Sequence, residues 1–471
     1  MESISTLRLL ANIINDAVST MERVYTQTGV LLPSLDDPFN PDDPAESLRQ
    51  DKEVFTAAKN IRAAAAQISA TVCDPARVVL NTANAFHLSS CLRAASELNI
   101  VEILAEVGAK GTSAEDIAAQ NHADPGLVAR ILRILATHHI FREVSPGLFA
   151  NNRISSTLNK GKLPSEIFSN LDDRLTGSSG VAALVEHTSD ICGKAGVYLA
   201  DTISSATEKL PFNVALGTDD PLFKWMQRPE NRHHVKRFAT AMKGTAQAEP
   251  ADLIFQGFDW SLLPNNGVIV DVGGGIGHLS LSVAKRYPHL RVVNQDLDSP
   301  IGLSRAYWKT HFHTHLDAEM VEFQVHDFLT PQPVKDAAVF LLRYILHDWP
   351  DSEAKTILAH LRASAQPTSR LVVIERVLPL VAREDPAAAS NSKTKDIPGA
   401  ARPIAALPLL PNWGAATAEL YMSDMTMYVM LGGVERTLDG FYTLFAQAGW
   451  ELIEVHHYTG SYLSQLVASP M

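Results

Sequence analysis

The chain contains few cysteines, no long apolar run and no excess of positive charge. Its three cysteines, Cys73, Cys91 and Cys192, are scattered and odd in number, which favours a reducing compartment over a disulfide framework. No apolar run reaches the roughly 18–20 residues of a membrane span, and the amphipathic, acid-containing residues 1–18 are typical of neither a signal nor a transit sequence. A formal net charge of -12 argues against nucleic-acid binding. We therefore expect a cytoplasmic protein with no membrane or nucleic-acid partner.

Length and composition predict more than one domain. With 471 residues, of which 46% are hydrophobic, the chain can build two cores. Its patterns predict four segments: a helical arm, a winged-helix-like module, a helical linker with a substrate lid, and an α/β domain, over residues 1–73, 74–165, 166–250 and 251–471. An Ala-, Pro- and Ser-rich segment, 379–415, is expected to begin with a mobile loop.

The most informative segment is Val268–His278, VIVDVGGGIGH, an apolar strand that runs into a glycine-rich loop and then a helix. Such a loop lets the backbone approach a ligand closely, at a helix N-terminus whose amides are free. The dinucleotide fingerprint G-x-G-x-x-G fails, because its last position, counted from Gly273, is His278. Asp271 would also repel a pyrophosphate, whereas it would attract an ammonium group. The pattern therefore favours S-adenosylmethionine over NAD, with a cradle made of Asp271, Gly273, Gly275 and Gly277.

Two further acidic residues follow the next predicted strands. Asp296 comes directly after the strand 291–295 and nineteen residues past Gly277, the place where a carboxylate can hold the hydroxyls of a ribose. An Asp is more often a turn or cap residue, but its distance from the glycine loop reverses that expectation. After the strand 321–325, Asp327 could accept the adenine amino group while Phe328 stacks on the ring.

A second group of polar residues lies after or within buried strands. His347 follows the apolar stretch 338–346 and falls at the carboxyl end of a central parallel strand, where open α/β sheets bind ligands. Asp351 is expected to cap a helix through Ala365. Glu375 interrupts an apolar strand, where a buried carboxylate is costly without a partner or a task. Glu435, after two glycines, would by itself be interpreted as the first-turn acid of a helix.

The motifs LRYILHDWPD, VIERVLP and GGVERT, in this order after the glycine loop, resemble those of the metal-independent class I O-methyltransferases, typified by plant caffeic acid and chalcone enzymes. The resemblance is closer to fungal polyketide O-methyltransferases of the aflatoxin and sterigmatocystin kind, and it extends from about Asp74 to the C-terminus. It implies an α/β fold with a Rossmann-like, seven-stranded cofactor domain and an N-terminal all-helical, winged-helix dimerisation domain.

The same resemblance assigns roles to individual residues. It makes His347 the general base, with Glu375 and Glu435 orienting it, and it implies that no metal takes part. It places Asp271 and the glycines at the methionine half of S-adenosylmethionine, Asp296 at the ribose, and Asp327 with Phe328 at the adenine. Arg343 stands where the plant enzymes usually have lysine, which keeps the charge at the cofactor but changes its geometry.

The chemistry of methyl transfer agrees with these roles. A sulfonium is already a good electrophile, so the protein must align a hydroxyl and remove its proton, for which a neutral imidazole suits. Carboxylates at the far ring nitrogen would fix the tautomer and stabilise the imidazolium. His311, His313 and His315 alternate, but no other ligands accompany them at a zinc spacing, and we expect a solvated helix or loop there.

The N-terminal half has a winged-helix pattern. A capping box at 112–115, a helix from Asp124 through Leu135, and two short strands within 141–151 are its signals. Its second helix offers only Arg130 and Arg133 as fixed cations on an apolar surface. We therefore expect that face to form a homodimer, as the resemblance implies, rather than to bind DNA as a regulator would.

The expected substrate is a phenolic or enolic small molecule, an aromatic or polyketide metabolite or an alkaloid-like one. Candidate pocket-wall residues are aromatic and methionine side chains, which suit a flat ligand although each is singly more often core: Phe223, Trp225, Phe238, Met242, Trp413, Met427 and Met430. A non-methylating enzyme that catalyses pericyclic or isomerising chemistry on the same scaffold is the alternative function.

Overall fold

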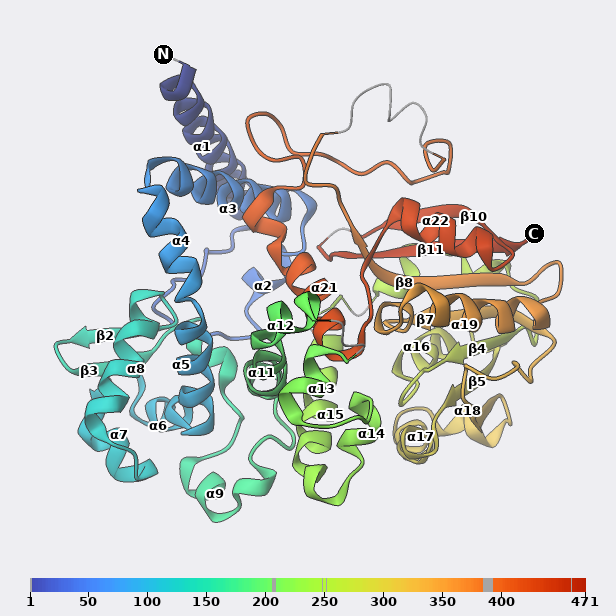
Figure 1. The fold of residues 1–471 in the computed structure, drawn as a ribbon, viewed down its shortest axis with the longest axis horizontal. Helices are drawn as coiled ribbons and strands as arrows, with labels where there is room; N and C mark the ends of the chain where they lie inside the picture. Colours follow the sequence, from blue (N-terminus) through green and yellow to red (C-terminus); the bar gives the residue numbers. More distant parts are fainter. Residues whose placement is uncertain (1, 206–208, 248, 251, 384–392, 459) are drawn as a thin grey trace. The chain divides into compact units, whose positions relative to one another are not determined.

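A computed structural model describes residues 2–205, 209–247, 249–250, 252–383, 393–458 and 460–471. The chain forms two compact units, Met1–Glu249 and Pro250–Met471, which are blue to green and yellow to red in Figure 1. The four-segment division stays a prediction. Much of the loop expected early in segment 379–415 falls on residues 384–392, outside the described residues.

The first unit begins with a helical hairpin. Helices α1 (Glu2–Thr28) and α3 (Lys52–Val72) pack on each other. The short helix α2 (Pro44–Leu48) lies between them in the chain, and α4 (Pro75–Ala83) follows α3. The carboxylates of Asp43, Asp51 and Asp74 each accept backbone amides at a helix start. These three N-caps set the residues at which α2, α3 and α4 begin.

Next come four helices and a small sheet, with the strand order β1–β3–β2. The elements are α5 (Phe86–Glu97), α6 (Ile100–Val107), β1 (Thr112–Ser113), α7 (Ala114–Asn121), α8 (Pro125–Thr137), β2 (Phe141–Ser145) and β3 (Leu148–Asn151). The capping box predicted at Thr112 is wrong by one residue. Ser113 is the N-cap of α7, because Asp116, three residues on, donates its amide to the Ser113 hydroxyl at 3.1 Å and accepts from it at 2.9 Å.

The apolar side of α8 does not face outward as expected. Val128, Leu132 and Leu135 are fully buried in the same core as Phe141 and Phe149. This side of the helix is thus occupied by its own domain and not free for a second subunit.

The described residues in the rest of the first unit form mainly helices: α9 (Pro164–Ser169), α10 (Val181–His187), α11 (Gly193–Val197), α12 (Leu199–Ser204), α13 (Pro211–Leu216), α14 (Leu222–Met226) and α15 (Arg232–Gln247). A π-helical turn, Thr188–Cys192, joins α10 to α11. It carries Asp190, whose carboxylate accepts from Arg93, Lys194 and Arg237 at 2.7–2.8 Å.

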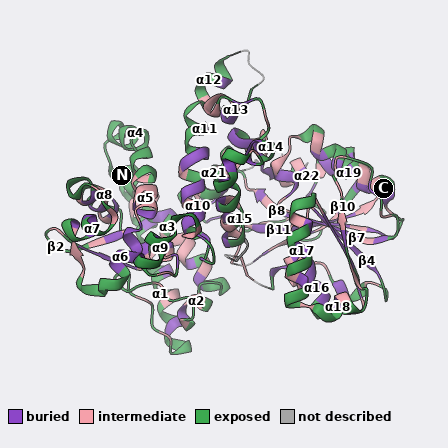
Figure 2. Ribbon diagram, turned by 90° about the horizontal axis from the view of Figure 1, so that it is seen from below, coloured by how far each residue is buried: buried purple, intermediate pink, exposed green. Residues whose placement is uncertain are grey.

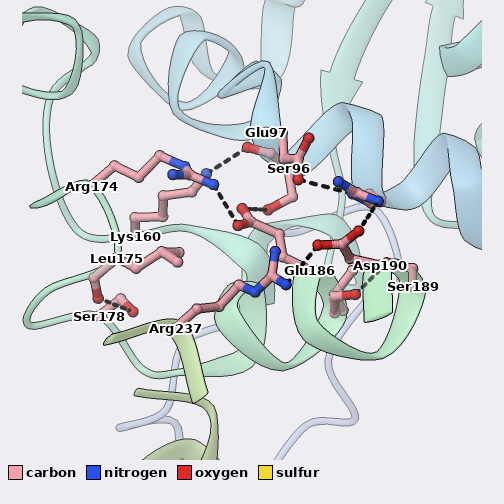
Figure 3. A network of polar contacts seen from close by, with 12 residues as sticks. Ser96, Glu97, Lys160, Arg174, Leu175, Ser178, Glu186, Ser189, Asp190 and Arg237 are labelled. Carbon is pink, nitrogen blue, oxygen red and sulfur yellow. Dashed lines mark hydrogen bonds and ion pairs between the residues drawn. The ribbon is translucent and has the colours of Figure 1, made fainter. Parts of the chain in front are cut away.

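Figure 3 shows a neighbouring part of the same buried network, which fixes the segment after β3 through Lys160. The Lys160 ammonium donates to the Ser96 carbonyl at 2.8 Å and to Glu102 at 3.2 Å. Glu186, on α10, accepts from the Ser96 hydroxyl at 2.9 Å and from Arg174. These bonds tie α5 to the helices that follow the small sheet.

The second unit is built on a mixed sheet with the strand order β10-β11-β8-β7-β4-β5-β6. The neighbouring strands in the part β8-β7-β4-β5-β6 pair in parallel. Strand β11 is antiparallel to β8, and β10 is antiparallel to β11. The strands are β4 (Val268–Val272), β5 (Arg291–Asp296), β6 (Val321–Val325), β7 (Ala337–Arg343), β8 (Arg370–Leu378), β10 (Trp450–His457) and β11 (Leu463–Pro470). A two-residue strand, β9 (Arg436–Thr437), adds to β8.

Alternating residues of these strands face two cores, as the period of a strand requires. Val270, Phe340 and Val373 face one core, and Ile269 and Val339 face the other. As far as the unit is described, its helices are α16 (His278–Arg286), α17 (Asp298–His311), α18 (His313–Asp317), α19 (Asp351–Ser364), α21 (Ala418–Leu431) and α22 (Leu438–Gln447). None of the helices in the described residues is long and apolar enough to cross a bilayer.

His315 departs from the solvated position expected for it. Its side chain is buried, stacks on Phe312 with ring centroids 4.9 Å apart, and places Nε2 3.2 Å from the Leu290 carbonyl oxygen. A histidine in α18 thus closes a small core around Trp308.

Candidate functional site

The loop after β4 has the backbone that its glycines predict. Gly273 and Gly275 have φ of 66° and 59°, a region in which L side chains are strained. A Cβ on Gly273 would lie 2.5 Å from Ile345, whereas a Cβ on Gly275 would meet nothing within 4 Å. Gly275 therefore borders open space, in which a ligand can approach the backbone.

Two carboxylates flank this space. Asp271 is buried, and its Oδ2 has no hydrogen-bond partner among the described residues. Burial raises the pKa of Asp271 to about 6. Asp296 accepts the amides of Gly275 at 2.8 Å and Leu297 at 2.7 Å, one on each oxygen. Each Asp296 oxygen keeps a lone pair for a further donor.

The two candidates for binding adenine, and the arginine that stands where the plant enzymes usually have lysine, lie around the same loop. A Cβ on Gly273 would be 3.4 Å from the Phe328 ring, so Phe328 borders the loop. Asp327 is exposed and accepts the Leu329 amide at 2.9 Å. Arg343 donates to His278 Nε2 at 3.0 Å, which joins the end of β7 to the start of α16. Burial, and then Arg343, lower the pKa of His278 to about 4, so its ring is neutral and can accept.

The second cluster centres on His347, in the short 3₁₀ turn Leu346–Asp348 after β7. Its Nδ1 lies 3.1 Å from Glu435 Oε1 and 4.0 Å from Glu375 Oε2, and its Nε2 lies 3.4 Å from Asp348 Oδ1. Glu375 Oε1 accepts the amides of Ile345 and Leu346 at 2.9 Å each. The three predicted residues thus meet at the carboxyl edge of β7 and β8.

The segment that carries Glu435 is fastened to the His347 turn. The Val434 amide donates to the His347 carbonyl at 2.9 Å, and a Cβ on Gly433 would lie 2.2 Å from the same oxygen. Arg436 donates to the carbonyls of Leu346 at 2.7 Å and Trp349 at 2.8 Å. Glycine is therefore required at 433 by close approach, and the arginine after Glu435 positions the turn.

Sequence reasoning missed several residues of this site and misplaced one. Asp348 and Arg436 stand beside predicted residues in the motifs, which was the available signal, whereas Asp424, which accepts the Glu435 amide at 2.9 Å, had none. Asp351 is not a helix cap, because Pro350 occupies the cap position of α19. Asp351 instead accepts from Arg436 at 2.9 Å.

The charges around His347 favour a bound proton. Burial lowers the pKa of His347, but Glu375, Asp348 and Glu435 outweigh burial and raise the pKa well above its ordinary value. Burial acts in the opposite direction on a carboxyl group and raises the pKa of Glu375. His347 therefore loses its proton, and forms the neutral imidazole that we expected, at a higher pH than an isolated histidine does.

The pocket-wall candidates lie partly in cores of their own units. In the first unit, Trp225 is buried edge-on against Phe212, whereas Phe223, which packs on Phe238 with ring centroids 6.0 Å apart, and Met242 remain exposed. In the second unit, Met430 is buried and Trp413 and Met427 are half-buried. Their contact with a substrate stays a prediction.

The fold and the two clusters define a Rossmann-like enzyme domain with a glycine-loop cofactor site and a buried histidine–carboxylate group. Residues 197–398 match the O-methyltransferase domain, and residues 80–161 match the O-methyltransferase dimerisation domain. An O-methyltransferase of Armillaria gallica is 38% identical over 480 residues, covering 99% of this chain and 100% of the relative.

Two more comparisons bear on family and fold. Sterigmatocystin 8-O-methyltransferase of Aspergillus parasiticus is 32% identical over 327 residues, covering 68% of this chain and 70% of the relative. The structure of LepI in complex with SAM matches the fold with a TM-score of 0.66 at 22% identity, covering 90% of this chain and 97% of that one. The chain belongs to the O-methyltransferase family and is an S-adenosylmethionine-dependent O-methyltransferase. The predicted fold class, family and cofactor are confirmed.

Proposed function

We propose that this enzyme methylates a phenolic or enolic hydroxyl of a small aromatic or polyketide metabolite, with His347 as the general base. The observation that carries the proposal is the hydrogen bond of His347 Nδ1 to Glu435 at 3.1 Å. When Nδ1 donates to a carboxylate, the lone pair of the neutral ring is on Nε2, which can accept the substrate proton.

The loop residues fit the cofactor. The orphaned, buried Oδ2 of Asp271 suits an ammonium group, the remaining lone pairs of Asp296 suit a diol, and the open space at Gly275 admits a ligand next to the backbone. Gly273, Gly277, Asp327, Phe328 and Arg343 complete the set that would hold it. Bound there, S-adenosylmethionine supplies a methyl group on a sulfonium. Gly275→Val should abolish its binding in calorimetry, because the new side chain fills that space.

The cluster then accounts for proton removal. The hydroxyl proton moves to His347 Nε2, and the carboxylates of Glu435 and Glu375 stabilise the imidazolium that forms. A phenol has a pKa near 10, so the raised pKa of His347 makes this transfer less uphill. An oxygen acceptor is also supported by the relatives, since one of them is named for the 8-O position of sterigmatocystin.

The test is His347→Gln, which keeps a hydrogen-bonding side chain but cannot take up a proton at neutral pH. We expect kcat to fall by roughly 10²–10⁴-fold while calorimetry shows an unchanged affinity for S-adenosylmethionine. His311→Gln, at an exposed position, is the control and should behave like the parent. Full turnover of a weakly acidic phenol by His347→Gln would refute the base assignment.

We further propose that a second copy of the chain covers α4. No residue of this nine-residue helix is buried (Figure 2), and Val79 and Leu80 are 68% and 60% exposed. A helix this short is marginal in water without packing. The match to the dimerisation domain also begins within this helix, at residue 80.

Light scattering tests this surface. The parent should be a dimer, and Val79→Asp with Leu80→Asp should be a monomer, because two charges would be buried at the contact. Leu127→Asp, at an exposed position of α8, is the matched control and should stay dimeric. A monomeric parent would overturn the homodimer, and a dimeric double variant would overturn the role of α4.

A further inference from the structure

One carboxylate oxygen at the site has two hydrogen-bond partners and a cation close by. Glu435 Oε1 accepts from Ser423 Oγ at 2.9 Å, is bonded to His347 Nδ1 at 3.1 Å, and lies 3.7 Å from Arg376 Nη1. The Arg376 guanidinium also donates to Ser423 Oγ at 2.5 Å. Because that hydroxyl accepts from Arg376, its own proton is directed to Glu435.

Arg376 approaches His347 from a second side as well. It lies over the Tyr344 ring, 5.6 Å from its centroid, and that ring is 5.2 Å from the His347 ring. Tyr344 has a φ of 55°, which is uncommon for a non-glycine residue. The guanidinium thus contacts both the carboxylate and the aromatic ring that border the histidine.

We propose that Arg376 is a positioning residue that, directly and through Ser423, holds part of the negative charge of Glu435 and so limits how strongly Glu435 retains the proton on His347. The inference rests on the proposed role of His347 as the base. Arg376 is next to Glu375 in the chain, but its side chain has a different role.

The other charged groups around His347 leave this task to Arg376. Arg343 lies over the same Tyr344 ring, 5.4 Å from its centroid, but it donates to His278. Asp348 is on the same turn, Glu375 is on β8, and Asp424, on α21, is bonded to the Glu435 amide. Arg436, on β9, donates to backbone carbonyls of the turn and to Asp351.

Three carboxylates therefore attract the imidazolium, and Arg376 is the cation beside the one that holds Nδ1. Burial alone would raise the pKa of Glu435, but His347, Arg376 and Ser423 outweigh it and lower that pKa. Without Arg376, Glu435 would interact with His347 more strongly, and the neutral base would form only at higher pH.

The first experiment compares the pH dependence of kcat in the parent, Arg376→Met and Arg376→Lys. We expect Arg376→Met to move the rise of kcat upward by about one pH unit, the lower end of what a neighbouring charge does, so kcat falls up to about tenfold at neutral pH and recovers at high pH. Arg376→Lys keeps the charge and should restore part of the shift. Arg370→Met, about 20 Å away at the other end of β8, controls for the lost charge.

A second readout does not depend on turnover. NMR titration of ¹³C-labelled histidines, with the His347 signal identified from its absence in His347→Gln, should show the same upward shift in the enzyme without substrate. Ser423→Ala should move it in the same direction but less, because Arg376 keeps its place on Tyr344.

The outcomes separate this inference from the proposed function. If His347→Gln is inactive as expected but Arg376→Met has the pH profile and histidine titration of the parent, Arg376 has no such role. A uniform loss of kcat at all pH values, with an unshifted titration, would also overturn it and indicate a structural role. If His347→Gln is fully active, the base assignment itself fails.

Discussion

Each unit contains a buried cluster of charged side chains, but the balance of charge differs between the two clusters. In the first unit, both oxygens of Asp190 are bonded, by Arg93, Lys194 and Arg237. In the second unit, three carboxylates surround one histidine, and Glu375 Oε2 and Glu435 Oε2 lack hydrogen-bond partners among the described residues. Cations outnumber carboxylates around Asp190, and carboxylates outnumber cations around His347.

The histidines of the two regions respond in opposite directions. Burial, and then Arg237, lower the pKa of His187 to about 4, whereas the carboxylates around His347 raise its pKa. The same residue type is therefore kept neutral in one cluster and favoured as a cation in the other. Removing a carboxylate whose charge is fully paired leaves uncompensated cations and destabilises the fold, whereas a carboxylate left with a free oxygen can stabilise a proton that arrives during catalysis.

The largest expected effect comes from breaking the paired cluster. Asp190→Asn would leave three cations without their shared carboxylate, and the free energy of unfolding should fall by about 3–5 kcal/mol, the usual result of removing one partner of a buried ion pair. Urea denaturation measures it. The kcat per folded molecule should be unchanged, so a stable but inactive variant would contradict a structural role.

A somewhat smaller effect is expected from acid. Because the pKa of His187 is lowered in the folded state, the unfolded chain binds more protons between about pH 4 and 6.5. Stability should therefore decrease as pH falls through this window, by roughly 2 kcal/mol from pH 6.5 to 5 for such a site. His187→Gln should weaken this dependence. His347 has the opposite sign, and its contribution should be lost as pH rises through its raised pKa.

Much of the fold was predictable from local patterns, but parts of the site were not. The strand before Asp271 and its glycine loop follow from apolar runs and backbone requirements that a few neighbouring residues express. The bonds of Arg436 to Leu346 and Trp349 span 90 and 87 residues, and they depend on how the chain returns to the sheet. Likewise, the apolar pattern of α8 predicts a buried side, but it does not show whether the same domain or a second subunit covers that side.

A mid-sized effect on activity should come from Glu435→Gln. The amide keeps the size of the side chain but removes the charge that stabilises the imidazolium, so the plateau of kcat at high pH, where His347 is already neutral, should fall about tenfold, as for the loss of one hydrogen bond to a charged group. Stability should change little. Asp190→Asn should therefore lose stability and keep its kcat, whereas Glu435→Gln should lose kcat and keep its stability. A Glu435→Gln variant that unfolds readily yet turns over normally would contradict this difference between the clusters.

The smallest effect should come from metal removal. The ligand atoms of His347, Glu375 and Glu435 lie within 4.8 Å of one another, a spacing that a metal could use. Nδ1 and Glu435 are bonded to each other instead, and a methyl group on a sulfonium needs no Lewis acid. Dialysis against EDTA should leave kcat unchanged. A loss that Zn²⁺ restores would show that the cluster is a metal site.

The measurement that tests the base assignment most directly is kcat for the parent and His347→Gln across phenols of graded acidity, with methyl transfer followed from labelled S-adenosylmethionine. We predict a deficit of roughly 10²–10⁴-fold for phenols with a pKa near 10, which shrinks towards zero for phenols already ionised at the assay pH. An equal deficit at every acidity, or none at all, would contradict His347 as the base, and substrate consumed without methyl transfer would favour the non-methylating chemistry.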